Sequence, residues 1–167
     1  MGKVQILAVL TMDGCLSSEL YDKAHQDLCL DRCGLDEIRE KALYHVTPDY
    51  SISMLHEWRK DGTNIRYLAE ATPDTADYIN GLLRMHAVDE IILYTVPFIS
   101  GSGRHFFKSA LPEQHWTLSS LKSYPNGVCR IIYILDKKQY SQNVRQAYIS
   151  IFRNRINVLI TNNLSRI

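Results

Sequence analysis

Two carboxylates lie where apolar segments of the sequence end. Asp13 follows the apolar run from Lys3 to Thr11 and precedes Gly14. Glu70 lies near the end of a second apolar segment, residues 64–71. A carboxylate at a strand end can bind and orient a substrate, but it can equally form an Asx-turn or cap a helix. The sequence therefore makes Asp13 and Glu70 candidate catalytic residues and leaves the structural alternative open for both.

A third candidate region follows the strongly apolar segment 88–97. This segment begins with two acids, Asp89 and Glu90, ends at Pro97, and runs into the loop Gly-Ser-Gly-Arg. Proline ends strand hydrogen bonding, and glycines let a backbone pass close to a neighbouring element or a ligand. Glycines are also ordinary turn residues, so the loop indicates either a ligand contact or a plain turn.

The cysteines and histidines do not form a metal or nucleophile motif. Cys29 and Cys33 have the i, i+4 spacing that places two side chains on one helix face, but no second Cys or His pair has matching spacing. We therefore expect reduced, buried thiols and no metal site. The six histidines form no recognisable catalytic dyad.

The elements that must position these residues alternate between strand and helix and then become strands only. This order predicts an α/β protein whose mostly parallel sheet has antiparallel strands at one end and flanking helices. The expected strands are 3–11, 42–46, 64–71, 88–97, 115–124 and 128–135, and the expected helices are 18–32, 35–41, one after Ser51 and one after Pro73.

Composition limits the classes of function. The chain has 167 residues, 46% hydrophobic residues and a net charge of +1. This balance gives no electrostatic attraction toward nucleic acid or an anionic membrane. No apolar run reaches the roughly 18 residues of a membrane span. The N-terminal apolar stretch continues into Asp13 without a cleavage site, so we expect a strand there and a cytoplasmic protein.

The segment 139–167 differs from the rest of the chain. Val144, Tyr148, Ile151 and Phe152 recur at helical spacing, interrupted by arginines. We expect a C-terminal helical extension that packs on the domain or on a partner subunit. Binding of nucleic acid or membrane through the arginines is the weaker alternative, because the arginines are few.

Three segments, taken in order, resemble the reductase domain of riboflavin biosynthesis, a relative of dihydrofolate reductase. ILAVLTMDGCLS resembles its first strand and the turn before the substrate pocket, and YLAEATPDTADYINGLL resembles the strand-to-helix turn that holds the cofactor. VDEIILYTVPFISGSGRHFF resembles its central strand, proline and glycine-rich loop. The resemblance implies a three-layer dihydrofolate reductase-like domain over residues 1–138.

The resemblance also implies an activity, a cofactor and an assembly. It predicts an NADPH-dependent reductase that acts on a pteridine- or pyrimidine-like heterocycle and forms a homodimer. Glu70 matches a substrate-binding carboxylate of the family. The cofactor-binding residues that it implies are Ala71, Thr72, Pro73, Asp74, Thr75, Gly101 and Gly103.

Two departures from the family pattern weaken the expected cofactor site. Ala71 and Thr72 replace one or two glycines, and each Cβ narrows the approach of a phosphate to the backbone. A side chain at positive φ also costs about 1–2 kcal/mol. The family's Thr-x-x-x-Asp-Asp-Pro segment is missing between Gly14 and Glu70. We therefore expect weak NADPH binding, with a degenerate, non-catalytic small-molecule-binding or structural dimer as the alternative.

Overall fold

The computed structural model describes residues 2–16, 28–61, 64–108 and 110–136. The chain divides into two units, Met1–Leu135 and Asp136–Ile167, and all helices and strands described below belong to the first. Most of the helix expected at 18–32 and the expected C-terminal helix lie outside the described residues.

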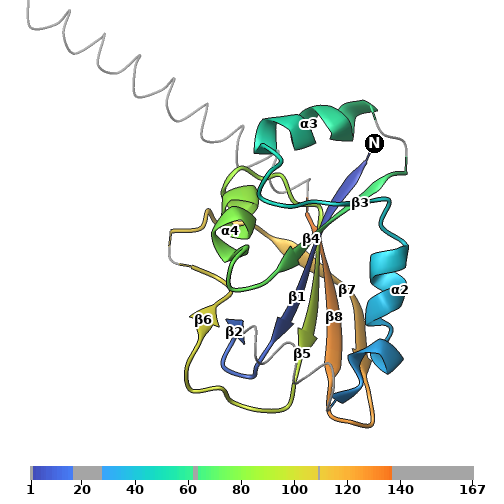
Figure 1. Cartoon of the computed structure of the whole chain (residues 1–167), viewed down its shortest axis with the longest axis vertical. Helices are drawn as coiled ribbons and strands as arrows, with labels where there is room; N and C mark the ends of the chain where they lie inside the picture. The colour runs from blue at the N-terminus through green and yellow to red at the C-terminus, as the bar shows by residue number, and fades with distance from the viewer. Residues whose placement is uncertain (1, 17–27, 62–63, 109, 137–167) are drawn as a thin grey trace, which may run out of the picture. The chain divides into compact units, whose positions relative to one another are not determined.

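The core of the first unit is a six-stranded mixed sheet in the order β3-β4-β1-β5-β8-β7 (Figure 1). Its first four strands are parallel, and β8 and β7 are antiparallel to their neighbours. This arrangement confirms the expected mostly parallel sheet with antiparallel C-terminal strands. The six strands are β1 (Lys3–Leu10), β3 (Tyr44–His45), β4 (Arg66–Ala71), β5 (Glu90–Thr95), β7 (Trp116–Ser123) and β8 (Cys129–Leu135).

Helices cover both faces of the sheet, which completes the expected three layers (Figure 1). The short 3-10 helix η1 (Leu30–Cys33) and α2 (Leu35–Glu40) pack on one face. The helices α3 (Ile52–Asp61) and α4 (Ala76–Arg84) pack on the other. A separate antiparallel pair joins β2 (Cys15–Leu16) to β6 (Arg104–His105).

Local sequence patterns explain the main elements. Strand β1 is buried on both faces after Lys3, as its continuous apolar run predicts. The buried residues of α4 include the four expected from helical spacing, Ala76, Ile79, Leu82 and Leu83, together with Asn80. Ser51 caps α3 by accepting the Met54 N–H at 3.2 Å, and this confirms the expected helix start.

The two acids at the start of β5 have different environments. Asp89 is buried and Glu90 is partly exposed. One Asp89 oxygen accepts the Val4 N–H at 3.0 Å, and the other accepts from the Arg59 guanidinium at 2.6 Å. Asp89 therefore fastens the start of β5 to β1 and to α3. These contacts explain why an acid stands at the start of the apolar strand β5.

The expectation about the cysteine pair needs correction. Cys29 is exposed and has a left-handed backbone, φ +48°, just before η1. Cys33 is buried at the end of η1. The two thiols therefore do not share one face of a regular helix, because the left-handed residue ends the helical geometry between them. No disulfide joins the four cysteines, all of which lie within the described residues.

Candidate functional site at the carboxyl edge of the sheet

Three loops meet at the carboxyl ends of the parallel strands. Residues 11–14 follow β1, residues 72–75 follow β4, and residues 96–103 follow β5. The chain after β1 leads to α2 on one face, and the chain after β4 leads to α4 on the other. Open α/β sheets bind ligands in the crevice where neighbouring connections leave toward opposite faces. The topology therefore places the candidate site at this edge.

Asp13 joins two of these loops. Its carboxylate accepts the backbone N–H groups of Ser100 at 3.2 Å and Gly101 at 3.0 Å. The Thr11 hydroxyl and these two N–H groups hold the pKa of Asp13 well below its usual range, against a smaller opposing effect of desolvation. Such a carboxylate stays ionised and is a poor proton acceptor at neutral pH. Its visible role is to hold the loops together, and a catalytic role stays a prediction.

Cys15 contacts both Asp13 and His105, and the sequence did not indicate either contact. The Cys15 thiol donates to the Asp13 carboxylate at 3.6 Å, and its sulfur lies 3.8 Å from the His105 Nδ1. Burial, followed by the charge of Asp13, raises the pKa of the Cys15 thiol. The thiol is therefore not activated as a nucleophile. The two residues meet because β2 pairs with β6, and strands of two residues leave no periodic signal.

Glu70 is bound by Arg39 of α2, which packs on the face of the sheet that does not carry α4. Arg39 of α2 donates Nε to Oε1 at 3.1 Å and Nη2 to Oε2 at 2.9 Å. His45 Nδ1 lies 3.9 Å from the same carboxylate. A two-point arginine contact is a strong, oriented ion pair. Glu70 can therefore meet a substrate only in competition with Arg39, and its catalytic role also stays a prediction.

The turn between β4 and α4 is closed by its own threonines. The Thr72 N–H donates to Thr75 Oγ1 at 2.9 Å, and the Thr75 N–H donates to Thr72 Oγ1 at 3.2 Å. This reciprocal pair has the bonding pattern of a capping box, but it lies across the turn before α4, whose N-cap position is Thr75. Pro73 has no N–H. Two of the amides that could receive a phosphate are therefore already bonded.

The backbone of this turn also differs from an open glycine turn. Among the described residues, the non-glycine positions with positive φ are Cys29, Asn64, His86 and Ala110. Ala71 and Thr72 are not among them, so the strained backbone that a glycine would permit is not adopted here. As it stands, the turn does not fit a tightly bound pyrophosphate.

Two cations lie beside the first turn of α4. Arg104 donates to the Pro73 carbonyl at 2.6 Å and forms an ion pair with Asp77, which Lys108 also contacts. Lys108 and then Arg104 lower the pKa of Asp77. Arg104 directly follows Gly103 in the loop after β5. Its partners in the structure are a carbonyl and a carboxylate, so a phosphate would have to compete with Asp77.

The two glycines of the loop after β5 serve different purposes. Gly101 has φ +66° with open space around the position of a Cβ. Gly103 has φ +127°, and a Cβ there would lie 3.2 Å from the Leu16 carbonyl oxygen. Gly103 therefore permits close packing against β2, whereas the surroundings of Gly101 leave room for a ligand. Cofactor contacts of both remain predictions.

Sequence comparisons find no relatives of this chain, whereas structural comparisons do. No family profile and no curated protein matches the sequence. A protein assigned to riboflavin biosynthesis from Shewanella sp. PV-4 is similar at 11% identity with a TM-score of 0.50, over 81% of this chain and 99% of the other. RibD of Acinetobacter baumannii is similar at 12% identity with a TM-score of 0.52, over 82% of this chain.

The described residues have the fold of these two riboflavin-biosynthesis proteins. This confirms the fold that the three sequence segments implied. The present chain spans 59% of the length of RibD. Identities of 11% and 12% establish the reductase fold alone, and its chemistry must be argued from the residues.

The described residues contain neither a cluster of metal-ligating side chains nor a helix able to span a membrane. Within these residues, no group of three or more His, Cys, Asp and Glu side chains is arranged to hold a metal ion. In the same part of the chain, no helix combines the length and apolar character that a bilayer crossing requires.

Proposed function

We propose that this chain is a degenerate member of the reductase fold that binds a small molecule but does not hold NADPH tightly enough for efficient catalysis. One observation carries the proposal: the reciprocal hydrogen bonds between Thr72 and Thr75 satisfy backbone amides at the turn where the resemblance places the cofactor phosphates. The engagement of Glu70 by Arg39 supports it. The open glycines that the family uses at this turn are replaced by Ala71 and Thr72.

The second candidate is an NADPH-dependent reductase acting on a pteridine- or pyrimidine-like heterocycle. It is favoured by the meeting of three loops at the carboxyl edge of the sheet, beside the N-terminus of α4. Asp74 N–H, Arg104 and Lys108 are the groups that would have to receive a phosphate there. NADPH would supply the hydride. This candidate requires one of two changes. Either the hydrogen bonds between Thr72 and Thr75 break, or Arg104 and Lys108 leave Asp77 and bind the phosphate.

A titration of the full-length protein with NADPH and NADH separates the candidates. A ligand present at about 100 times its Kd raises the free energy of unfolding by roughly 2.7 kcal/mol. We expect no comparable shift in melting temperature at millimolar NADPH. Micromolar binding, together with loss of NADPH absorbance when a pteridine or pyrimidine is added, would establish the reductase instead.

A further inference from the structure

A hollow of about 340 Å³ opens on the face of the sheet that carries α4. None of its lining residues belongs to the three loops at the carboxyl edge, so it is separate from the site described above. Its size falls at the lower end of the range for small-molecule pockets, about 300–1,000 Å³. The side chains that line it come from α4, β5, β7, β8 and the segment between β6 and β7.

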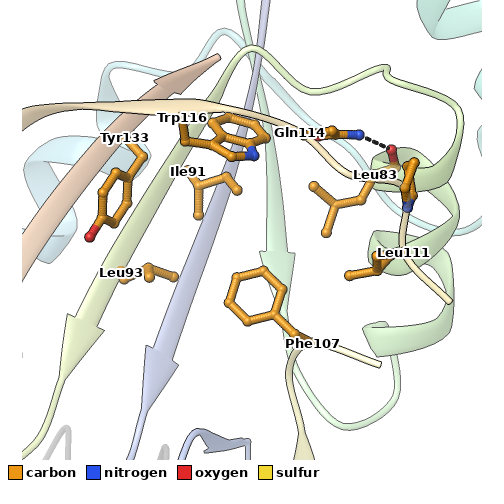
Figure 2. Close-up of a pocket in the computed structure, with 9 residues that line it drawn as sticks. Leu83, Ile91, Leu93, Phe107, Leu111, Gln114, Trp116 and Tyr133 are labelled. Atoms are coloured by element: carbon orange, nitrogen blue, oxygen red, sulfur yellow. Dashed lines mark hydrogen bonds between the residues drawn. The ribbon is translucent and has the colours of Figure 1, made fainter. Parts of the chain in front are cut away.

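Aromatic rings and aliphatic side chains form the walls of this pocket. The rings of Trp116, Tyr133 and Phe107 stand around one space, with Ile91 and Leu93 of β5 between them (Figure 2). No charged side chain lines the pocket within the described residues. An ionised ligand would therefore lose its hydration here without gaining a partner, which is costly. A flat, uncharged ring would instead stack on the aromatic walls.

The pocket has three side chains with hydrogen-bond donors, Gln114, Trp116 and Tyr133, and only those of Gln114 are bonded to other described residues. The Gln114 amide donates to the Leu83 carbonyl at 2.7 Å (Figure 2). The same amide nitrogen lies 3.0 Å from the His86 Nδ1, so the Gln114 donors are already bonded. The Trp116 indole N–H and the Tyr133 hydroxyl make no hydrogen bond to other described residues. A ligand acceptor would satisfy one of these donors.

We propose that this pocket binds an uncharged, planar, fused-ring heteroaromatic molecule whose carbonyl or ring nitrogen accepts the Trp116 indole N–H. The aromatic walls select a flat ring, the absence of charge among the described lining residues selects a neutral one, and the indole selects an acceptor. Ring compounds whose phosphate or carboxylate must enter the pocket bind more weakly for the same reason.

This second site does not depend on the proposed function. NADPH titration reports on the carboxyl edge of the sheet, whereas the experiment below reports on Trp116. Either result can therefore fail without the other.

The test uses quinazolin-4-one as a neutral probe and its carboxylate derivative as a charged counterpart. The chain has two tryptophans, Trp58 and Trp116, so two indole N–H signals appear in a proton–nitrogen correlation spectrum of the full-length protein. Trp116→Phe assigns them. We expect the neutral probe to shift the Trp116 signal saturably and to leave Trp58 unchanged. The carboxylate derivative should bind at least about tenfold more weakly.

Variants then test the geometry by calorimetry. Trp116→Phe keeps a ring but removes the donor, and should weaken binding about three- to tenfold, the range of one net hydrogen bond. Leu111→Trp should fill the pocket and abolish binding, and Phe107→Ser should weaken binding by removing an exposed wall. Leu43→Ser is the matched control. Leu43 is an exposed residue just before β3, outside the pocket, and its substitution should leave the Kd unchanged.

Several results would overturn the proposal. Equal affinity for the two probes would show that the pocket does not select a neutral ligand. Unchanged binding by Leu111→Trp, or by Phe107→Ser if the first variant fails to fold, would place the probe elsewhere. A Trp116 signal that moves with protein concentration, and not with probe, would instead identify the pocket as an interface between copies of the chain.

Discussion

Asp89 and Arg59 form a buried ion pair where β5 begins, and each side chain is less than a tenth exposed. Arg59 also donates to the Ala87 carbonyl at 3.3 Å, and its Nε has no hydrogen-bond partner among the described residues. A buried pair contributes little net stability, but removing one partner leaves an uncompensated charge. Loss of Asp89 would therefore leave the buried Arg59 guanidinium without its counter-charge.

We predict that Asp89→Asn lowers the free energy of unfolding by about 3–5 kcal/mol, because Arg59 would remain buried without a counter-charge. Urea denaturation measures this change. Glu57→Gln is the control, because it breaks the exposed Lys60–Glu57 pair and should cost less than about 1 kcal/mol. The double variant Arg59→Met, Asp89→Asn removes the buried charge and keeps an acceptor for the Val4 N–H, so it should recover much of the loss. Equal effects of Asp89→Asn and Glu57→Gln would contradict the argument.

We predict that Thr72→Gly strengthens NADPH binding about tenfold or more. The substitution removes the hydroxyl that bonds the Thr75 N–H and the Cβ that narrows the turn, and a tenfold change corresponds to about 1.4 kcal/mol. The free energy of unfolding should fall by about 0.5–1.5 kcal/mol, because the Thr75 N–H loses its acceptor. Calorimetry measures the binding, and Thr47→Gly in an exposed loop is the control. Low-micromolar binding by the wild type, with no gain in the variant, would refute the steric argument.

The connection between α4 and the segment after β6 depends on Asn80, which is fully buried. Its Nδ2 donates to the Phe106 carbonyl at 2.9 Å and to the Ala76 carbonyl at 2.7 Å. Its Oδ1 accepts the Lys108 N–H at 3.1 Å. One side chain therefore holds the backbone on both sides of Phe107, which forms a wall of the apolar pocket.

We predict that Asn80→Leu lowers the free energy of unfolding by about 1–3 kcal/mol, the cost of leaving a buried donor or acceptor unsatisfied. Hydrogen exchange should increase at Lys108 in particular, because its N–H loses its acceptor. Arg84→Gln, an exposed substitution on the same helix, should stay within about 0.5 kcal/mol. Unchanged exchange at Lys108 would show that the segment is held by other contacts.

At the scale of the whole molecule, we predict a homodimer. The sequence resemblance implies a homodimer, and the described surface includes exposed apolar side chains such as Leu118 and Leu121 on the edge strand β7. Sedimentation velocity at tens of micromolar measures the mass of the particle. A single species with the 19.2 kDa mass of one chain would count against the dimer.

We also predict that a chain ending at Lys138 melts at a lower temperature or loses solubility, without a specific loss of ligand affinity. The sequence of the extension carries an apolar stripe, Val144, Tyr148, Ile151 and Phe152. Burying each such side chain contributes roughly 1.5–3 kcal/mol, so the stripe should be packed in the native protein. Thermal melts and sedimentation of both lengths test this. An unchanged melting temperature and mass would reopen the binding hypothesis based on the arginines of the extension.

The elements of this fold could be predicted because their signals are local. The continuous apolar run of β1, the helical spacing of Ala76, Ile79, Leu82 and Leu83, and the Pro-Asn-Gly turn before β8 each specify a backbone conformation over a few residues. The reciprocal pair of hydrogen bonds between Thr72 and Thr75 is local too, and the T-x-x-T spacing at a helix start could have indicated it.

The tertiary structure alone decided the environment of the two candidate carboxylates. Arg39 is 31 residues from Glu70, and the Ser100 N–H is 87 residues from Asp13. These pairs meet because parallel strands bring the ends of distant segments to one edge and because helices on opposite faces reach different sides of each strand. Strand order and face assignment depend on the packing of the whole sheet. For this reason the sequence located the carboxylates at strand ends but could not show that other parts of the chain already bind them.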